Sequence, residues 1–98
     1  AGARGLKVVL FEKRELGGVC LNEGCIPTKT LLYSAKMYDH ATGGKKYGIT
    51  AADVTYEYKK MADRKTKVVR KLVAGIKMKM ENNNVEVIKG EASVHSRL

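Results

Sequence analysis

Hydrophobic and polar positions along the chain predict a strand, two helices and a second strand, in that order. Residues 6–12 form a short, almost continuously apolar run rich in β-branched and aromatic side chains, which is typical of a strand in a parallel sheet covered on both faces. Apolar residues then recur at helical spacing over residues 25–41 and 56–80. A short strand is predicted over residues 85–88, and the pattern allows it to continue through Val94. These elements indicate an α/β fold.

Glycine and asparagine residues predict where the elements end. Residues 1–4 are predicted as the end of a helix that Gly5 terminates. The order helix, glycine, strand and acidic residue is that of the second half of a βαβ unit. Thr42-Gly43-Gly44 predicts the end of the first long helix, and residues 45–54 predict a loop or a short extended piece. Asn82-Asn83-Asn84 predicts a turn after the second long helix.

The second long helix carries an apolar stripe along one side. Its members, at spacings close to three and four residues, are Tyr58, Met61, Val68, Leu72, Ile76 and Met80, with Val69 and Val73 beside them. The two long helices are expected to run antiparallel and to pack against each other. The residues expected at their contact are Leu31, Leu32, Ala35, Leu72 and Ile76.

Length and charge narrow the classes of function. The chain has 98 residues, enough for one domain at most, and its 19 Lys and Arg against 10 Asp and Glu leave a net charge of +9. With that charge, one alternative is that the chain is a small basic module that binds nucleic acid. The basic residues, however, spread along the second helix and alternate with Glu and Asp, and the sequence carries no paired zinc ligands, helix-turn-helix signature or RNA-stacking motif. We therefore expect a solvated basic helix face and no nucleic-acid partner. No apolar run approaches the roughly 20 residues that span a bilayer, so no membrane association is expected.

The two cysteines of the chain, Cys20 and Cys25, stand five positions apart. In a regular helix that offset would give a rise of about 7.5 Å and turn the side chains about 140° apart. A disulfide needs Cα atoms within roughly 4.4–6.8 Å, so a bonded pair requires a break in the helix, for which Gly24 provides the place. Pro27 suits the first turn of a helix, and a thiol at a helix start has a lowered pKa. The pair therefore fits a redox-active disulfide, with two reduced structural cysteines or half of a metal site as the alternatives.

The residues around the cysteines resemble those of a known family. Gly17-Gly18-Val19-Cys20-Leu21-Asn22-Glu23-Gly24-Cys25-Ile26-Pro27-Thr28-Lys29 is similar to the redox motif of the flavoprotein disulfide reductases, with two glycines, Cys-x4-Cys, a hydrophobic-Pro step and a lysine. Within that family the motif most resembles the dihydrolipoamide dehydrogenases, because glutathione and mercuric reductases usually carry valine where Leu21 and Ile26 stand. Those two reductase types are kept as alternatives.

The resemblance implies that residues 1–98 are a fragment of a Rossmann-like FAD-binding domain with two long antiparallel helices. The Gly-x-Gly-x-x-Gly turn that cradles the flavin pyrophosphate, the NAD domain and the dimerisation domain are absent from this sequence. On this expectation the chain looks like a piece of a longer protein, and it would be inactive alone.

The same resemblance assigns FAD contacts to particular positions. Glu12 would accept hydrogen bonds from the adenosine ribose hydroxyls, and the two glycines would let the backbone approach the flavin's phosphate and sugar. Lys29 would lie near the flavin ring, and the backbone of Ala92 near the adenine. The expected cofactor-binding residues are Glu12, Lys13, Gly17, Gly18, Val19, Cys20, Lys29 and Ala92. No residue is assigned to a metal.

The implied activity is that of a dihydrolipoyl dehydrogenase. Electrons would pass from dihydrolipoamide, carried on a lipoyl domain, to the Cys20–Cys25 disulfide, then to FAD and finally to NAD+. Cys20 would exchange with the substrate, and Cys25 would lie against the flavin. The complete enzyme would be a homodimer of the cytoplasm, or of the mitochondrial matrix in a eukaryote.

Overall fold

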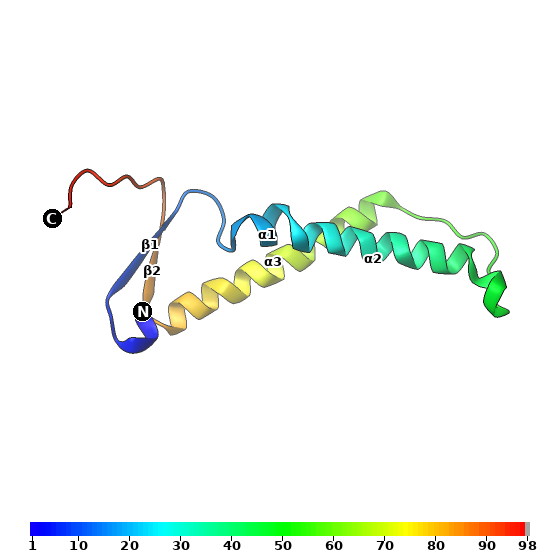
Figure 1. The fold of residues 1–98 in the computed structure, drawn as a ribbon, viewed down its shortest axis with the longest axis horizontal. Coiled ribbons are helices and arrows are strands. Elements are labelled where there is room, and N and C mark those ends of the chain that lie inside the picture. Colours follow the sequence, from blue (N-terminus) through cyan, green and yellow to red (C-terminus); the bar gives the residue numbers. More distant parts are fainter. Residues whose placement is uncertain (98) are drawn as a thin grey trace.

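The computed structural model describes residues 1–97 and places the helices and strands in the predicted order (Figure 1). The elements are η1 (Gly2–Arg4), β1 (Val8–Glu12), α1 (Gly18–Glu23), α2 (Cys25–Thr42), η2 (Gly44–Tyr47), α3 (Tyr58–Asn82) and β2 (Val85–Lys89). The two strands lie at one end of the molecule, and α2 and α3 extend away from them.

The sheet is parallel, as the sequence predicted. β1 and β2 pair in a register that places Val8 beside Val85 and Glu12 beside Lys89. The chain between them contains all the long helices, which agrees with the long crossover that two parallel strands require.

The prediction that the sheet is covered on both faces is wrong for the residues described. One face meets α3, because Val85 and Val87 line the same hollow as Met80 and Lys77 of α3. On the opposite face Val9 is 40% exposed and Phe11 53% exposed. In β1, burial therefore alternates from one residue to the next although the sequence is continuously apolar.

The two long helices run in opposite directions and cross, which confirms the antiparallel prediction (Figure 1). The expected contact residues are correct only in part. Leu31 and Ile76 are half-buried, whereas Ala35 is exposed, Leu32 is 61% exposed and Leu72 is 40% exposed.

Each helix instead buries a β-branched residue, Thr30 in α2 and Val73 in α3. The apolar stripe of α3 is wider than the surface that its neighbours cover, and the covered strip lies on the Val69 and Val73 side. Tyr58 and Leu72, which belong to the same stripe, are exposed. Periodicity locates such a stripe, but it does not select the residues within it that touch another helix.

Helix ends lie close to the predicted positions. α2 ends at Thr42 rather than residue 41, and the N–H of Gly43 donates to the Asp39 carbonyl at 2.8 Å. α3 spans 58–82 rather than the predicted 56–80, a shift of two residues at each end. Asn84 has a φ of 55° immediately after it, which confirms a turn there. Gly5, with a φ of 81°, ends η1 as predicted, although η1 is only a short 3-10 turn.

The predicted extension of the second strand through Val94 is wrong. β2 ends at Lys89, and residues 91–97 have no regular secondary structure. The N–H of Gly90 still donates to the carbonyl of Glu12 at 2.9 Å, but β1 ends at that residue. Among the described residues no strand lies beyond it to bond residues 91–94, and Val94 is 93% exposed.

The molecule is elongated and its core is small. Its extents are 68 × 26 × 19 Å and its radius of gyration is 20.5 Å, against about 13 Å for a compact domain of similar length. Within residues 1–97 the buried apolar side chains are Leu16 and Val73. Leu16 lines a hollow with Lys77 and Met80 of α3, and Val73 lines one with Asn22 of α1, so the core lies where α1 and the loop before it approach α3.

The outward face of α3 is strongly basic. The helix sequence holds nine Lys and Arg against only Asp63 and Glu81, so the expected alternation of bases with acids is wrong for this helix. Within the part of the chain that the structure describes, the ion pair recorded for this helix joins Lys60 to Glu57 at 3.4 Å. No helix among residues 1–97 combines the length and the apolarity that crossing a membrane requires.

Candidate redox site

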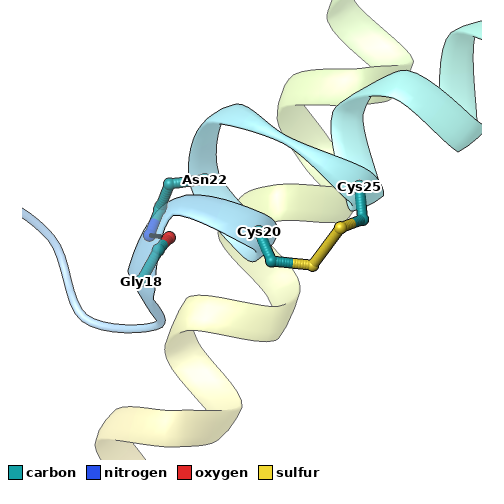
Figure 2. Close-up of a disulfide and its surroundings, with 4 residues drawn as sticks. All are labelled: Gly18, Cys20, Asn22 and Cys25. Atoms are coloured by element: carbon teal, nitrogen blue, oxygen red, sulfur yellow. Dashed lines mark hydrogen bonds between the residues drawn. A yellow bond between two sulfur atoms is a disulfide. The ribbon is translucent and has the colours of Figure 1, made fainter.

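A disulfide joins Cys20 of α1 to Cys25 of α2 (Figure 2). The two helices meet at Gly24, whose φ of −124° and ψ of −110° are far from helical values. This break brings the two Cα atoms to 4.8 Å, closer than the rise of about 7.5 Å that an unbroken helix would impose. The predicted departure from ideal helix at Gly24 is therefore confirmed, and the two cysteines are bonded rather than free.

The helix α1 is a feature that sequence reasoning missed. Gly17 and Gly18 have positive φ values of 112° and 78°, and helical structure begins directly at Gly18. Two adjacent glycines usually indicate a loop, because glycine is a poor helix former. The six residues of α1, which include Gly18, are too few to show an apolar period that could have revealed the helix.

The glycines of the motif differ in what a side chain at each position would contact. A Cβ at Gly17 would lie 3.0 Å from Leu21 Cδ1 and 3.3 Å from Ile76 Cδ1, and one at Gly24 would lie 3.2 Å from the Cα of Cys20. Both positions are therefore required for close packing of the site. At Gly18 a Cβ would meet nothing within 4 Å. Its backbone is the one that is open to an approaching ligand.

Both cysteines are exposed, so the disulfide can be reached from solvent. Thiol–disulfide exchange requires this, because the attacking thiolate must approach a sulfur along the S–S axis. Cys25 is also the first residue of α2, an 18-residue helix. Within residues 1–97 no cluster of three or more His, Cys, Asp or Glu side chains is placed to bind a metal ion.

A groove of about 500 Å³ lies between the end of β1 and α1. Its lining residues are Glu12, Lys13, Arg14, Glu15, Gly18, Val19, Asn22 and Glu23. Four of the expected cofactor-binding residues thus come together: Glu12, Lys13, Gly18 and Val19. Arg14, Glu15, Asn22 and Glu23 were not expected there, although Asn22 and Glu23 stand between the two cysteines in the sequence.

Among residues 1–97, the charged side chains of the groove are Arg14, Glu15 and Glu23, which have ion-pair partners, and Glu12 and Lys13, for which no ion pair is recorded. The Arg14 guanidinium pairs with the Glu23 carboxylate, and Lys89 pairs with Glu15 at 3.7 Å. Glu12 Oε1 accepts the backbone N–H of Arg14 at 3.1 Å, and within residues 1–97 its other carboxylate oxygen has no recorded hydrogen bond. Glu12 is half-buried at the carboxyl end of β1, the end of a parallel strand where ligands bind in open α/β sheets.

The remaining expected contacts do not line this groove. Lys29 is exposed on α2, one helical turn after Cys25. Ala92 is exposed beyond the end of β2, at the same edge of the sheet as Glu12. Gly17 is exposed, and a Cβ added there would contact Leu21 and Ile76. Cys20 does not line the groove either and carries one sulfur of the disulfide.

Comparison with known proteins decides the family. A family described as pyridine nucleotide-disulphide oxidoreductase matches residues 1–97. The chain belongs to this family. The match includes both cysteines of the Cys20–Cys25 disulfide.

Similar members of the pyridine nucleotide-disulphide oxidoreductase family are dihydrolipoyl dehydrogenases. The chain is 48% identical to that of Mycoplasma genitalium over 95 residues, which is 96% of this chain and 21% of the relative. It is 44% identical to the Geobacillus stearothermophilus protein over 92 residues (94% of this chain, 20% of the relative). It is 44% identical to a Bacillus subtilis protein over 95 residues, which is 95% of this chain and 21% of the relative. The chain therefore spans about a fifth of the length of these curated relatives.

Proposed function

We propose that this chain provides the redox-active disulfide of a dihydrolipoyl dehydrogenase. The observation that carries the proposal is the exposed Cys20–Cys25 disulfide between α1 and α2, in a chain of the pyridine nucleotide-disulphide oxidoreductase family. Identities of 44–48% to dihydrolipoyl dehydrogenases favour dihydrolipoamide, which donates electrons, over glutathione disulfide or mercury(II), which accept them, as the substrate that meets the cysteine pair.

The chemistry at the two sulfurs is thiol–disulfide exchange. A thiolate of dihydrolipoamide attacks Cys20 Sγ, the Cys20–Cys25 bond breaks, and Cys25 leaves as a thiolate. The second dihydrolipoamide thiolate then attacks the substrate sulfur of the mixed disulfide and releases Cys20 as a thiolate. Lipoamide leaves with a new ring disulfide, having lost two electrons, and the cysteine pair has gained them. The two substrate thiol protons pass to solvent or to the cysteine thiolates.

The assignment of Cys20 as the sulfur that exchanges and Cys25 as the leaving thiolate rests on helix position. Cys25 begins an 18-residue helix, where the helix dipole stabilises a negative charge. Cys20 lies inside the short helix α1 and is exposed. A leaving thiolate of lower basicity departs faster, which favours attack at Cys20.

The residues of the groove fit part of an FAD molecule. The carboxylate of Glu12, with one oxygen available, suits the two hydroxyls of a ribose, and the open backbone at Gly18 suits a closely approaching phosphate or sugar. Lys13 and Val19 would line the same site, and Lys29 and Ala92 would contact the flavin and the adenine outside the groove. When bound, FAD supplies an acceptor for the electron pair of the dithiol and passes it to NAD+.

We further propose that the chain is a fragment of an FAD-binding domain of Rossmann type. Two parallel strands joined by a helical crossover support this proposal, as does a span of about a fifth of the relatives. The protein to which it belongs would act as a homodimer in the cytoplasm, or in the mitochondrial matrix of a eukaryote. Its partner would be a lipoyl carrier domain.

Reduction by dihydrolipoamide tests this function without any cofactor. The oxidised chain is incubated with excess dihydrolipoamide, and free thiols are counted by alkylation and mass spectrometry. We expect two new thiols in each chain, with lipoamide formed in equal amount. In Cys20→Ser and Cys25→Ser the number of thiols should not change, because neither variant can form the bond. A pair that stays oxidised, or one that is already reduced when isolated in air, would refute the proposal.

A further inference from the structure

Asn22 connects the helix that carries Cys20 to the loop that precedes it. Its side-chain Nδ2 donates two hydrogen bonds, one to the Leu16 carbonyl and one to the Gly18 carbonyl, both of 3.0 Å. Figure 2 shows the second of these bonds beside the disulfide. Asn22 is half-buried and lies two residues after Cys20 on α1. Both amide hydrogens are therefore used within the motif itself.

Leu16 provides a fixed point for this link. Its side chain is only 6% exposed, and it lines a hollow together with Lys77 and Met80 of α3. The next residue, Gly17, packs so closely that an added Cβ would lie 3.3 Å from Ile76 Cδ1 of α3. The carbonyl that accepts from Asn22 is thus held against the longest helix of the molecule.

The start of α1 has little other side-chain support among residues 1–97, because the exposed Arg14–Glu23 ion pair holds the other end of this helix. Its N-cap position is Gly17, and no side chain caps the helix there. Gly17 and Gly18 also have positive φ values, a backbone conformation that glycine adopts without the steric cost of a side chain. Without the Asn22–Leu16 bond, the start of α1 would be joined to Leu16 only through these two glycines, while the exposed Arg14–Glu23 ion pair would still hold the end of the helix.

We propose that Asn22 is a positioning residue that holds Cys20 within bonding reach of Cys25 while the disulfide is open. The bond from Asn22 to Leu16 keeps α1 in the orientation that places the two Cα atoms 4.8 Å apart, and the bond to Gly18 supports the first turn of the helix. The two thiols then face a high effective concentration of each other, which favours closure of the bond. This inference rests on the proposed function, because it concerns a pair that opens and closes.

The equilibrium with glutathione measures this effect directly. One chain with two thiols reacts with one oxidised glutathione to give the Cys20–Cys25 disulfide and two reduced glutathiones, so two electrons move from the chain to glutathione. The equilibrium constant of this reaction has units of concentration. It is proportional to the effective concentration of one cysteine thiol at the other, so a change in the constant between variants reports a change in that effective concentration. It is measured by quenching with acid and alkylating at a series of glutathione ratios.

Three variants separate positioning from general stability. Asn22→Ala removes the amide, and Asn22→Asp keeps its shape but removes both N–H donors. Asn83→Ala is the matched control, because Asn83 Nδ2 also donates to a backbone carbonyl, that of Lys79 at 2.8 Å, at the far end of α3. We expect the constant to fall about threefold to tenfold in both Asn22 variants, since two hydrogen bonds are lost, and to stay unchanged in Asn83→Ala.

Helix content, measured by circular dichroism, distinguishes the outcomes. α2 and α3 contain 18 and 25 residues, whereas α1 contains six. If only α1 loses its helical structure in the Asn22 variants, their circular dichroism signal should stay close to that of Asn83→Ala. A constant that is unchanged in the Asn22 variants would overturn the inference, as would a fall seen only together with a large loss of helix. If the unmutated chain does not cycle with glutathione at all, the proposed redox function fails instead.

Discussion

The backbone N–H of Gly90 donates a hydrogen bond of 2.9 Å to the carbonyl oxygen of Glu12, so the two parallel strands end together. This bond brings the segment that follows β2, including Ala92, to the edge of the sheet where the Glu12 carboxylate lies. Ligands of open α/β sheets bind at the carboxyl ends of the strands. The groove between β1 and α1 opens at this same edge, within a few residues of the disulfide.

The first prediction concerns Glu12 in the complete flavoenzyme. Glu12→Ala should weaken FAD binding by about tenfold to a hundredfold, because hydrogen bonds to a charged group contribute roughly 1.5–3 kcal/mol. FAD release during dialysis, followed by flavin absorbance, measures the change. Glu15→Ala is the control, because Glu15 lines the same groove but is paired with Lys89. Equal FAD loss in both variants would show that Glu12 has no specific contact with the ribose.

The second prediction concerns the 98-residue chain by itself. It should hold FAD weakly or not at all and should have no dihydrolipoamide dehydrogenase activity, because no Gly-x-Gly-x-x-Gly pyrophosphate turn occurs in its sequence. Titration of FAD fluorescence with the chain, and an assay of NADH formation, check the two parts. Tight binding of one FAD to each chain would show that the groove beside α1 is sufficient without that turn.

The third prediction separates the two sulfurs in the complete flavoenzyme. Cys20→Ser should block reduction by dihydrolipoamide but leave a Cys25 thiolate that perturbs the flavin spectrum. Cys25→Ser should abolish the long-wavelength thiolate–flavin absorbance band. Absorbance spectra of both variants, recorded with and without dihydrolipoamide, test these two expectations. A band that survives Cys25→Ser and vanishes in Cys20→Ser would reverse the assignment of the two thiols.

The fourth prediction concerns the small core beside the redox site. Val73 is 8% exposed and Val19 is 70% exposed, and both lie in helices. Val73→Ala should lower the free energy of unfolding by about 1–2 kcal/mol, because it removes buried methyl groups and leaves a cavity. Val19→Ala should change it by less than about 0.5 kcal/mol, as exposed substitutions usually do. Urea unfolding of the chain measures both, and equal losses would show that Val73 is not a core residue.

Element order, helix ends and the bonded cysteine pair could be predicted from local sequence. Gly5, with a φ of 81°, and Asn84, with a φ of 55°, end their elements because glycine and asparagine adopt the left-handed backbone conformation more readily than other residues, and this preference acts within a few residues. The spacing of Cys20 and Cys25 around Gly24 required a helix break if the pair was bonded, and the break is present. These are short-range properties that any fold containing the segment must respect.

Contacts between distant segments were decided by the tertiary structure alone. The hydropathy pattern predicted that Leu72 and Ile76 would both lie at the contact between the two long helices. In the structure Val73 is buried instead, and Leu72 is exposed. Residues 6–12 read as a strand covered on both faces, yet the helices reach only one face of β1, and Phe11 is exposed.

The groove and the Asn22 link also depend on folding. Glu12 and Val19 come together only because the chain turns back between β1 and α1, and the Leu16 carbonyl becomes a fixed acceptor for Asn22 only because the Leu16 side chain is buried against α3. Local sequence determines which backbone conformations each segment can adopt. Which side chains then lose their contact with water depends on how the segments cross, and a periodic pattern does not specify the position or angle of that crossing.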